Sequence, residues 1–188
     1  MKKSLKVVVV VVIFLIVTIG TVLAYHGFFS TYEIAEKEVG PYTLATKRFV
    51  GGYYKVGPTM TEVDSWLREN AVTSSKGVGL FYDDPAKVPE NELRSDVGNV
   101  LENVDEQKLA KIKEKFDVKE IVRQKAVVVE FPIKSSLSYM LAPIKVYPMI
   151  SKYWKEKGYP DSVSDGFSIE IYDMDGKITT YIMPIPEK

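Results

Sequence analysis

The stretch Leu80-Phe81-Tyr82-Asp83 has a counterpart 90 residues later, Glu170-Ile171-Tyr172-Asp173. Each stretch closes a predicted strand and runs into a turn, which in the first case is marked by Asp84-Pro85. A second pair of similar stretches surrounds Trp66 and Trp154, which are 88 residues apart. Because the two offsets nearly agree, the sequence predicts that one module occurs twice.

The elements around these stretches have the same order in both halves. The first half is expected to contain a strand at 42–49, a helix from the N-cap Thr59 to Asn70, and strands at 78–82 and 93–101. The second half is expected to contain a strand at 121–132, a helix at 138–157, and strands at 167–172 and 177–185. Pro143 and Pro148 are each expected to start or kink the helix. A two-residue turn at Asp175-Gly176 is expected to join the last two strands. The sequence thus predicts an α+β fold of two β-α-β-β modules with pseudo-twofold symmetry. A ligand cleft is expected where the modules meet.

Residues 7–24 form a run of 18 residues without a charge. At roughly 1.5 Å per residue, a helix of this length covers about 27 Å, which suffices for the hydrocarbon core of a bilayer. Lys2, Lys3 and Lys6 precede the run, so the positive-inside rule places residues 1–6 in the cytoplasm and the domain on the other side. We therefore expect an uncleaved transmembrane signal anchor at 7–24, a juxtamembrane linker at 25–32 and a domain at 33–188.

Cleaved secretion is the alternative to an anchor. Val22-Leu23-Ala24 has small residues at the spacing that signal peptidases use, which would place the cleavage site before Tyr25. The apolar run is, however, longer than the roughly 7–15 residues of a typical signal peptide core. Both readings export the domain.

Composition excludes several classes of site. The chain has 25 basic and 25 acidic side chains, and without the three N-terminal lysines the domain carries a net charge of −3, which argues against a nucleic-acid partner. There is no cysteine and only one histidine, His26, so thiolate chemistry, disulfides and histidine-based triads or metal sites are not expected. No glycine-rich phosphate loop occurs, and we expect no metal and no cofactor.

A family resemblance rests on four blocks of residues. Gly79-Leu80-Phe81-Tyr82-Asp83-Asp84-Pro85, followed by Val88-Pro89 and Leu93-Arg94-Ser95-Asp96, resembles the signature of GyrI-like domains. Ser168-Ile169-Glu170-Ile171-Tyr172 resembles the final strand of these domains. The resemblance covers about residues 33–186. It implies two β-α-β-β modules around a cleft that, in many members, binds hydrophobic and often cationic compounds.

The second half also resembles a membrane-anchored animal branch of this family, which includes a receptor for reticulophagy. The resemblance rests on Leu137-Ser138, Leu141-Ala142, Val146 and Pro148. We do not carry the receptor function over, because the sequence ends at Lys188 without the long tail that bears the autophagy motif of that receptor.

Glu170 is the main candidate for the ligand site. Strand periodicity places Ser168, Glu170 and Tyr172 on one face, and the resemblance implies that an acidic residue of this strand faces the cleft. There a carboxylate could neutralise a cationic ligand or act as a general base; the competing reading is an exposed strand carboxylate paired with a lysine. Further candidates are aromatic or apolar residues expected to line the same cleft: Tyr172, Tyr82, Leu80, Tyr54 and Tyr139.

Three functions remain open from the sequence. The first is a membrane-anchored, non-catalytic binder of a small hydrophobic or cationic ligand. The second is a hydrolase of hydrophobic, cyclopropane-type electrophiles, with Glu170 positioning water and Tyr82 or Tyr172 stabilising the transition state. The third is a protein-interaction adaptor with a vestigial cleft, which a cleft packed shut by its own side chains would favour.

Overall fold

The structure is a computed structural model that describes residues 2–160 and 167–186. The expected cytoplasmic segment 1–6 therefore lies partly outside the described residues, as do residues 187–188 of the expected domain. The described chain forms four α-helices, two short 3₁₀ helices and one antiparallel sheet of eight strands, which confirms the α+β class. The elements are α1 (Lys2–Tyr25), β1 (Ile34–Val39), β2 (Tyr42–Val50), η1 (Tyr53–Lys55), α2 (Gly57–Glu69), β3 (Lys76–Phe81), η2 (Glu90–Glu92), β4 (Arg94–Leu101), α3 (Glu106–Lys115), β5 (Asp117–Ile121), β6 (Gln124–Pro132), α4 (Ser136–Glu156), β7 (Ser168–Asp173) and β8 (Ile178–Pro184).

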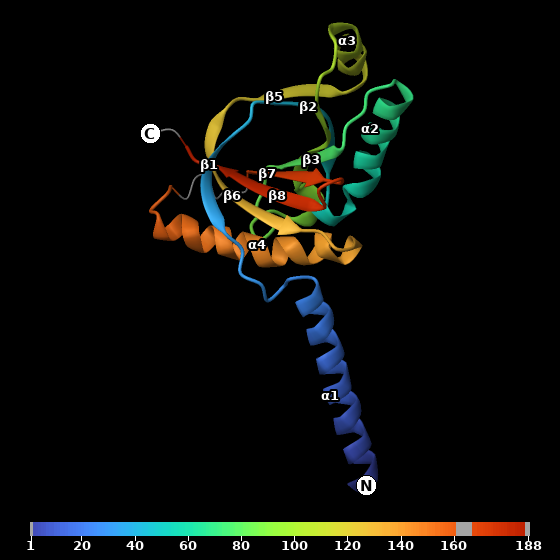
Figure 1. The fold of residues 1–188 in the computed structure, drawn as a ribbon, viewed down its shortest axis with the longest axis vertical. Helices are drawn as coiled ribbons and strands as arrows, with labels where there is room; N and C mark the ends of the chain where they lie inside the picture. The colour runs from blue at the N-terminus through green and yellow to red at the C-terminus, as the bar shows by residue number, and fades with distance from the viewer. Residues whose placement is uncertain (1, 161–166, 187–188) are drawn as a thin grey trace.

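The sheet has the strand order β1-β6-β8-β7-β3-β4-β2-β5 and is curled (Figure 1). Its centre is the antiparallel pair β3 and β7, in which Gly79 lies directly across from Glu170. On one side of this pair lie β4, β2 and β5, and on the other side β8, β6 and β1. The two predicted halves thus meet at β3 and β7, the two strands that contain the repeated stretches.

Both faces of the sheet are covered. The inner face of the curl is filled by aliphatic side chains from seven of the strands, among them Leu44, Leu80, Val128 and Ile169. The outer face of the second half packs against α4, and the outer face of the first half packs against α2 and α3. This arrangement follows from the side-chain alternation of the strands, since consecutive residues supply the two cores.

Helix α4 runs without interruption through Pro143 and Pro148. Ser135 and Ser138 form a capping box at its start, and the helix buries Ser138, Ala142, Val146, Ile150 and Trp154, one residue in every four. Each internal proline lacks the N–H that would bond to the carbonyl four residues earlier. The two prolines therefore weaken the helix, and the tertiary contacts of the buried residues stabilise it.

Two local expectations were wrong. Helix α2 begins at Gly57, so Thr59 lies inside the helix and is not its N-cap. Pro58 lies in the first turn, where proline is well suited because the backbone N–H of that position has no partner within the helix. The β7–β8 connection has four residues instead of a two-residue turn, since Asp173 pairs with Ile178. The Asp173 carboxylate accepts a hydrogen bond from the Gly176 N–H at 2.7 Å, and Lys177 adopts a positive φ.

Helix α1 projects away from the domain (Figure 1). Its stretch Ser4–Tyr25 is long and apolar enough to cross a bilayer and is not buried against the protein, although a signal sequence has the same properties. The end of α1 is tied to the start of α4. Lys134 Nζ donates to the Tyr25 carbonyl at 2.6 Å, and His26 Nδ1 lies 2.9 Å from Ser138 Oγ.

Candidate functional site

Glu170 lies in the centre of β7, on the face that α4 covers, and its side chain is buried. Its two carboxylate oxygens accept hydrogen bonds from two different elements. Tyr147 of α4 donates to Oε1 at 2.5 Å, and Tyr172 of β7 donates to Oε2 at 2.8 Å. The Tyr147 hydroxyl also lies 2.8 Å from Ser168 Oγ. The carboxylate is thus hydrogen-bonded without any contact with a cation in the described chain.

Two more tyrosine rings complete the surroundings of this carboxylate. The Tyr139 ring meets Tyr172 edge to face with the centroids 6.0 Å apart, and Tyr147 meets Tyr181 in the same way at 5.6 Å. We call Glu170, Tyr139, Tyr147, Tyr172 and Tyr181 the Glu170 cluster. The faces of aromatic rings attract cations.

Burial dominates the electrostatics of the cluster. It raises the pKa of Glu170, and the two tyrosine hydroxyls offset only part of this effect. Burial and the neighbouring carboxylate together hold the pKa values of Tyr147 and Tyr172 well above the usual tyrosine range. The tyrosines are therefore hydrogen-bond donors at neutral pH, and Glu170 is a carboxyl group that a positive charge would stabilise in its ionised form.

The neighbouring strand β3 presents glycine to this cluster. A Cβ on Gly79 would lie 2.7 Å from the Phe81 ring and 3.5 Å from the Tyr172 hydroxyl, and a Cβ on Gly77 would lie 3.5 Å from the Tyr172 ring. Glycine in a central strand marks a close approach by other groups. Here it allows the side chain of Tyr172 to lie over the backbone of β3.

Tyr82 and Leu80 do not join the Glu170 cluster. Because Gly79 is paired with Glu170, the next residue, Leu80, faces the inner side of the curl, where it packs with Ile169. Tyr82 is packed against the same inner core and stacks on Phe167. The expected equivalence of Tyr82 and Tyr172 on one groove is therefore wrong, since residues 90 apart in these two strands lie on opposite faces of the sheet.

Tyr82 instead belongs to a charged network at the inner face. Its hydroxyl donates to Asp96 Oδ2 at 2.5 Å, and Lys119 Nζ lies 2.6 Å from the same oxygen. Arg48 Nε is 2.8 Å from Asp96 Oδ1, close enough for an ion pair but without the alignment of a hydrogen bond. This buried carboxylate, unlike Glu170, already has two cationic partners.

The Asp83-Arg94 part of the motif forms an ion pair that joins the loop after β3 to the start of β4. Arg94 Nη2 and Nε contact the two Asp83 oxygens at 2.6 and 3.0 Å, and this pairing holds the pKa of Asp83 below its usual range. Tyr54 lies apart on η1, 76% exposed, where its hydroxyl donates to Glu90 at 2.8 Å. The structure thus brings Glu170, Tyr172 and Tyr139 together. Ligand contacts by Tyr82, Leu80 and Tyr54 stay predictions.

Sequence reasoning missed Tyr147, Tyr181 and the role of Ser168. Tyr147 follows Tyr139 by eight residues, about two helical turns, so the two tyrosines share a side of α4. That spacing was the available signal. Tyr181 lies directly across from Glu170 in the β7–β8 pair, a relation that only the register reveals.

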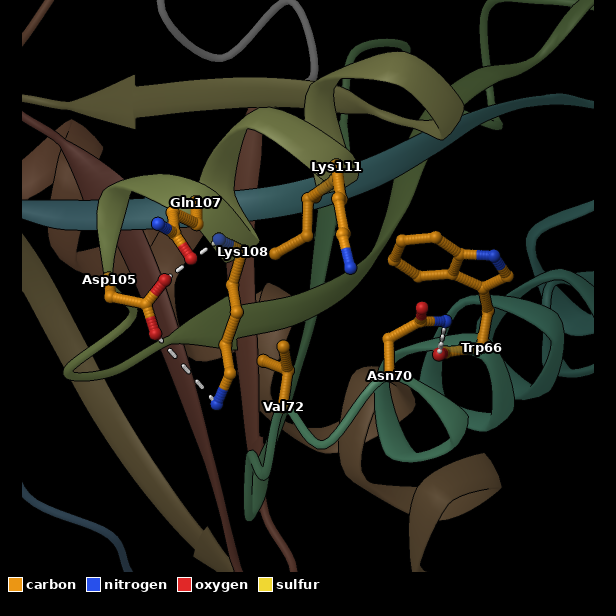
Figure 2. A pocket seen from close by; sticks show the side chains of 8 residues that line it. Trp66, Asn70, Val72, Asp105, Gln107, Lys108 and Lys111 are labelled. Carbon is orange, nitrogen blue, oxygen red and sulfur yellow. Dashed lines mark hydrogen bonds and ion pairs between the residues drawn. The ribbon is translucent and has the colours of Figure 1, made fainter.

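Two surface hollows lie away from the cluster. Figure 2 shows the first, a cavity of about 200 Å³ between α2 and α3 that is lined by Trp66, Asn70, Val72, Asp105, Gln107, Lys108, Lys111 and Ile112. It is smaller than most ligand sites, which occupy roughly 300–1,000 Å³. Its polar groups bond locally, as in the bond from the Lys108 N–H to Asp105 at 2.8 Å.

The second hollow, at the ends of β2 and α3, has a volume of about 420 Å³ and contains Arg48 but no residue of the Glu170 cluster. Among the described residues, no group of three or more histidine, aspartate or glutamate side chains could hold a metal ion. We take the Glu170 cluster as the candidate site because it combines a buried carboxyl group, which has no cationic partner in the described chain, with aromatic rings.

Comparison with known proteins gives a consistent picture. The human testis-expressed protein 264 is 27% identical over 172 residues, which are 86% of this chain and 51% of that protein. A DNA gyrase inhibitor from Pectobacterium carotovorum is 43% identical over 51 residues, which are 27% of this chain and 33% of that protein. The chain thus spans between a third and about half of the length of these relatives.

Solved structures share the fold at low sequence identity. The C-terminal domain of EcmrR is 17% identical with a TM-score of 0.53, and the match covers 84% of this chain and 99% of that one. SAV2435 bound to tetraphenylphosphonium is 13% identical with a TM-score of 0.50, and the match covers 83% and 94%. The family described as the GyrI-like small molecule binding domain matches residues 31–185. Since this match takes in the whole sheet and helices α2 to α4, the chain belongs to the GyrI-like small-molecule-binding domain family.

Proposed function

We propose that this chain is a membrane-anchored, non-catalytic binding protein for a small hydrophobic, cationic ligand, and that the Glu170 cluster is its site. The observation that carries the proposal is the burial of a carboxylate that has two tyrosine donors and, in the part of the chain that the structure describes, no cationic partner. A bound cation would offset the desolvation of Glu170, whereas an anion would add repulsion.

The chemistry of the surrounding side chains supports a flat or aromatic cation. Tyr147 and Tyr172 bond to the carboxylate, and the rings of Tyr139 and Tyr181 pack against these two tyrosines. Aromatic rings can contact a positive charge through their faces. SAV2435, which shares the fold, has been solved with tetraphenylphosphonium, an aromatic cation. That compound is therefore a suitable probe for this chain.

Ligand access requires α4 to move. Glu170 is buried and Tyr147 of α4 bonds directly to it, so the site is closed as it stands. Pro143 and Pro148 each remove one backbone hydrogen bond from α4, which lowers the cost of bending or partly unwinding this helix. We propose that α4 opens at these positions to admit the ligand.

The closed packing also bears on the adaptor alternative. An adaptor would gain nothing from a buried, unpaired carboxylate, because an apolar residue of similar size would make a more stable core. The hydrolase alternative uses the raised pKa of Glu170, which suits a general base. Both Glu170 oxygens accept tyrosine hydroxyls, however, so a water could reach the carboxylate only after the same opening.

The membrane anchor is the second part of the proposal. We propose that α1 spans the bilayer uncleaved, with its N-terminus in the cytoplasm and the domain outside. The length and composition of Ser4–Tyr25 and the lysines at its start support this arrangement. We propose no nucleic-acid partner, because the domain carries a net negative charge.

We also infer that the domain arose by duplication of one β-α-β-β module. The order β2-α2-β3-β4 recurs as β6-α4-β7-β8, and each module has its third element at the centre of the sheet. Superposing the two halves of the domain tests this inference. The strands of the two halves should overlay with an odd residue offset between β3 and β7, and failure of α2 to overlay on α4 would contradict the duplication.

Calorimetry with two probes tests the ligand site. Glu170→Gln keeps the shape of the side chain and removes its charge, so affinity for tetraphenylphosphonium should fall roughly tenfold to a thousandfold. Affinity for the neutral triphenylphosphine oxide should change little. Glu130→Gln, at an exposed position of β6, is the matched control and should alter neither affinity.

Four outcomes would count against this proposal. Equal losses for both probes, or no loss for either, would place the site elsewhere. Covalent change of a cyclopropane-containing probe, followed by mass spectrometry and abolished by Glu170→Gln, would favour the hydrolase. Absence of binding by the wild-type chain would favour the adaptor.

A further inference from the structure

The outward face of α4 is apolar over its first three turns. Opposite the buried stripe, the helix presents residues at the spacing i, i+3, i+4, i+7 and i+11, which are Leu137, Met140, Leu141, Ile144 and Pro148. Met140 and Ile144 are 69% and 62% exposed, while Leu137 and Leu141 are half-buried. We call these five residues the α4 outer face. A continuous apolar stripe of this kind on the surface of a domain marks a contact with another apolar phase.

The charges along the helix are unevenly distributed. The α4 outer face contains no charged residue, and the next turns along the same side carry Lys152 and Lys155, both exposed. Lys152 Nζ also lies 3.8 Å from Glu156 Oε1, in an exposed ion pair. An apolar segment followed by lysines suits a helix that lies in the interface of a bilayer, where the apolar side chains reach the acyl chains and the lysines reach anionic headgroups.

The position of α4 is fixed by the end of α1. Lys134, just before α4, donates to the carbonyl of Tyr25, the last residue of α1, and Ser138 in the first turn of α4 contacts His26. The start of α4 is thus in direct side-chain contact with the end of the apolar helix α1. Figure 1 shows that α1 leaves the domain on the side that α4 covers, and that α4 runs across the direction of α1.

We propose that the α4 outer face lies in the interface of the membrane that α1 enters, with Lys152 and Lys155 over anionic headgroups. This inference rests on the proposed membrane anchor. A helix lying in this way buries its apolar face about 5–10 Å into the boundary between headgroups and acyl chains. The occupant is the bilayer rather than a protein, because α1 brings the bilayer surface to the first turn of α4.

The arrangement gives α4 two different neighbours. Its inner side carries Tyr139 and Tyr147 of the Glu170 cluster, and its outer face carries Met140 and Ile144. The helix that must move to open the site is then the helix in contact with lipid. A hydrophobic cation that partitions into the interface would meet the site from the membrane side.

Site-directed spin labelling of the full chain tests the contact. Because the chain contains no cysteine, single cysteines can be introduced without other changes. A nitroxide is attached to Ile144→Cys, to Val122→Cys in the exposed turn after β5, and to Val12→Cys in the middle of α1. Each protein is reconstituted into vesicles of phosphatidylcholine and phosphatidylglycerol. Collision rates are then measured with oxygen, which dissolves in lipid, and with a water-soluble nickel complex.

Three labels decide between the outcomes. At Ile144→Cys, the ratio of oxygen to nickel collisions should exceed that at Val122→Cys by roughly threefold or more, as expected for an interfacial position. Equal ratios at these two sites, with a lipid-like ratio at Val12→Cys, would overturn the α4 contact and leave the anchor standing. A water-like ratio at Val12→Cys would overturn the anchor and the contact together. Spin–spin broadening at Ile144→Cys would place a second copy on this face and overturn the assignment to lipid.

Discussion

Glu170 is buried and has no cationic partner in the described chain. The other buried carboxylates, Asp83 and Asp96, each have at least one cationic partner. Asp83 is paired with Arg94, and Asp96 with Arg48 and Lys119. Burying an unpaired carboxyl costs stability, and costs of this kind are typical of functional sites. The difference between Asp96 and Glu170 therefore distinguishes a structural carboxylate from a candidate binding group.

The raised pKa of Glu170 predicts a pH effect on stability. A carboxyl whose pKa is higher in the folded state keeps its proton there, so its stabilising contribution is complete below the ordinary glutamate range and is lost as the pH rises through the folded pKa. Glu170→Gln does not titrate. Its free energy of unfolding relative to the wild type should therefore increase from about pH 4.5 upward, by at most about 1.4 kcal/mol per pH unit.

Denaturant unfolding of both proteins in detergent, between pH 4 and 8, measures this difference. Other carboxylates cancel in the comparison because both proteins contain them. A difference that stays constant with pH, or that shrinks as the pH rises, would contradict the burial of an uncompensated Glu170.

At the scale of the element, α4 is the helix on which the site depends. It supplies Tyr139 and Tyr147 to the Glu170 cluster, yet it contains two internal prolines. Pro148 is exposed, so its ring contributes little to the core, and its replacement by alanine restores a backbone N–H. An element held by tertiary contacts rather than by its own propensity is suited to a cover that opens.

We expect Pro148→Ala to stabilise the fold by about 1–3 kcal/mol, because alanine can complete the helical hydrogen bond that proline lacks. The same change should weaken tetraphenylphosphonium binding, since a stiffer α4 opens less readily. Pro58→Ala in the first turn of α2 is the control, and it should change the stability by no more than about 0.5 kcal/mol. Equal stabilisation by both changes would show that the missing hydrogen bond at Pro148 does not weaken α4.

At the scale of the whole molecule, the domain and α1 form one connected unit. The contacts of Lys134 with Tyr25 and of Ser138 with His26 join the start of α4 to the end of the apolar helix. Tyr32 adds a bond from its hydroxyl to the Gly27 carbonyl at 2.8 Å and packs against Phe131. The orientation of the domain relative to α1 is thereby defined by contacts on residues 25–32.

Topology is the testable consequence at this scale. The intact mass of the membrane-extracted protein should correspond to the full 21.2 kDa chain, because the apolar run is too long for a typical signal peptide. A protease added from the outer side of sealed vesicles should digest the domain and spare α1. A mature chain that begins at Tyr25 would contradict the anchor, and a domain protected in sealed vesicles would reverse the proposed orientation.

The sequence alone predicted much of this fold, because those features depend on local order. The apolar run identified α1, residue alternation placed Glu170 and Tyr172 on one face of β7, and the repeated stretches predicted the order of the elements. A resemblance in a few motifs named the family that the match over residues 31–185 confirms. None of these inferences required knowledge of which strands are neighbours.

Only the tertiary structure decided which residues meet. Shifting a strand pair by one residue turns every side chain to the other face. Because Gly79 is paired with Glu170, Tyr82 lies on the opposite face of the sheet from Tyr172, with which it was predicted to share a cleft. Tyr147 reaches Glu170 across 23 residues, and Ser138 reaches His26 across 112, through packing that no local pattern encodes. Local sequence sets periodicity and propensity, whereas register and helix rotation are set by how the whole chain buries its apolar side chains.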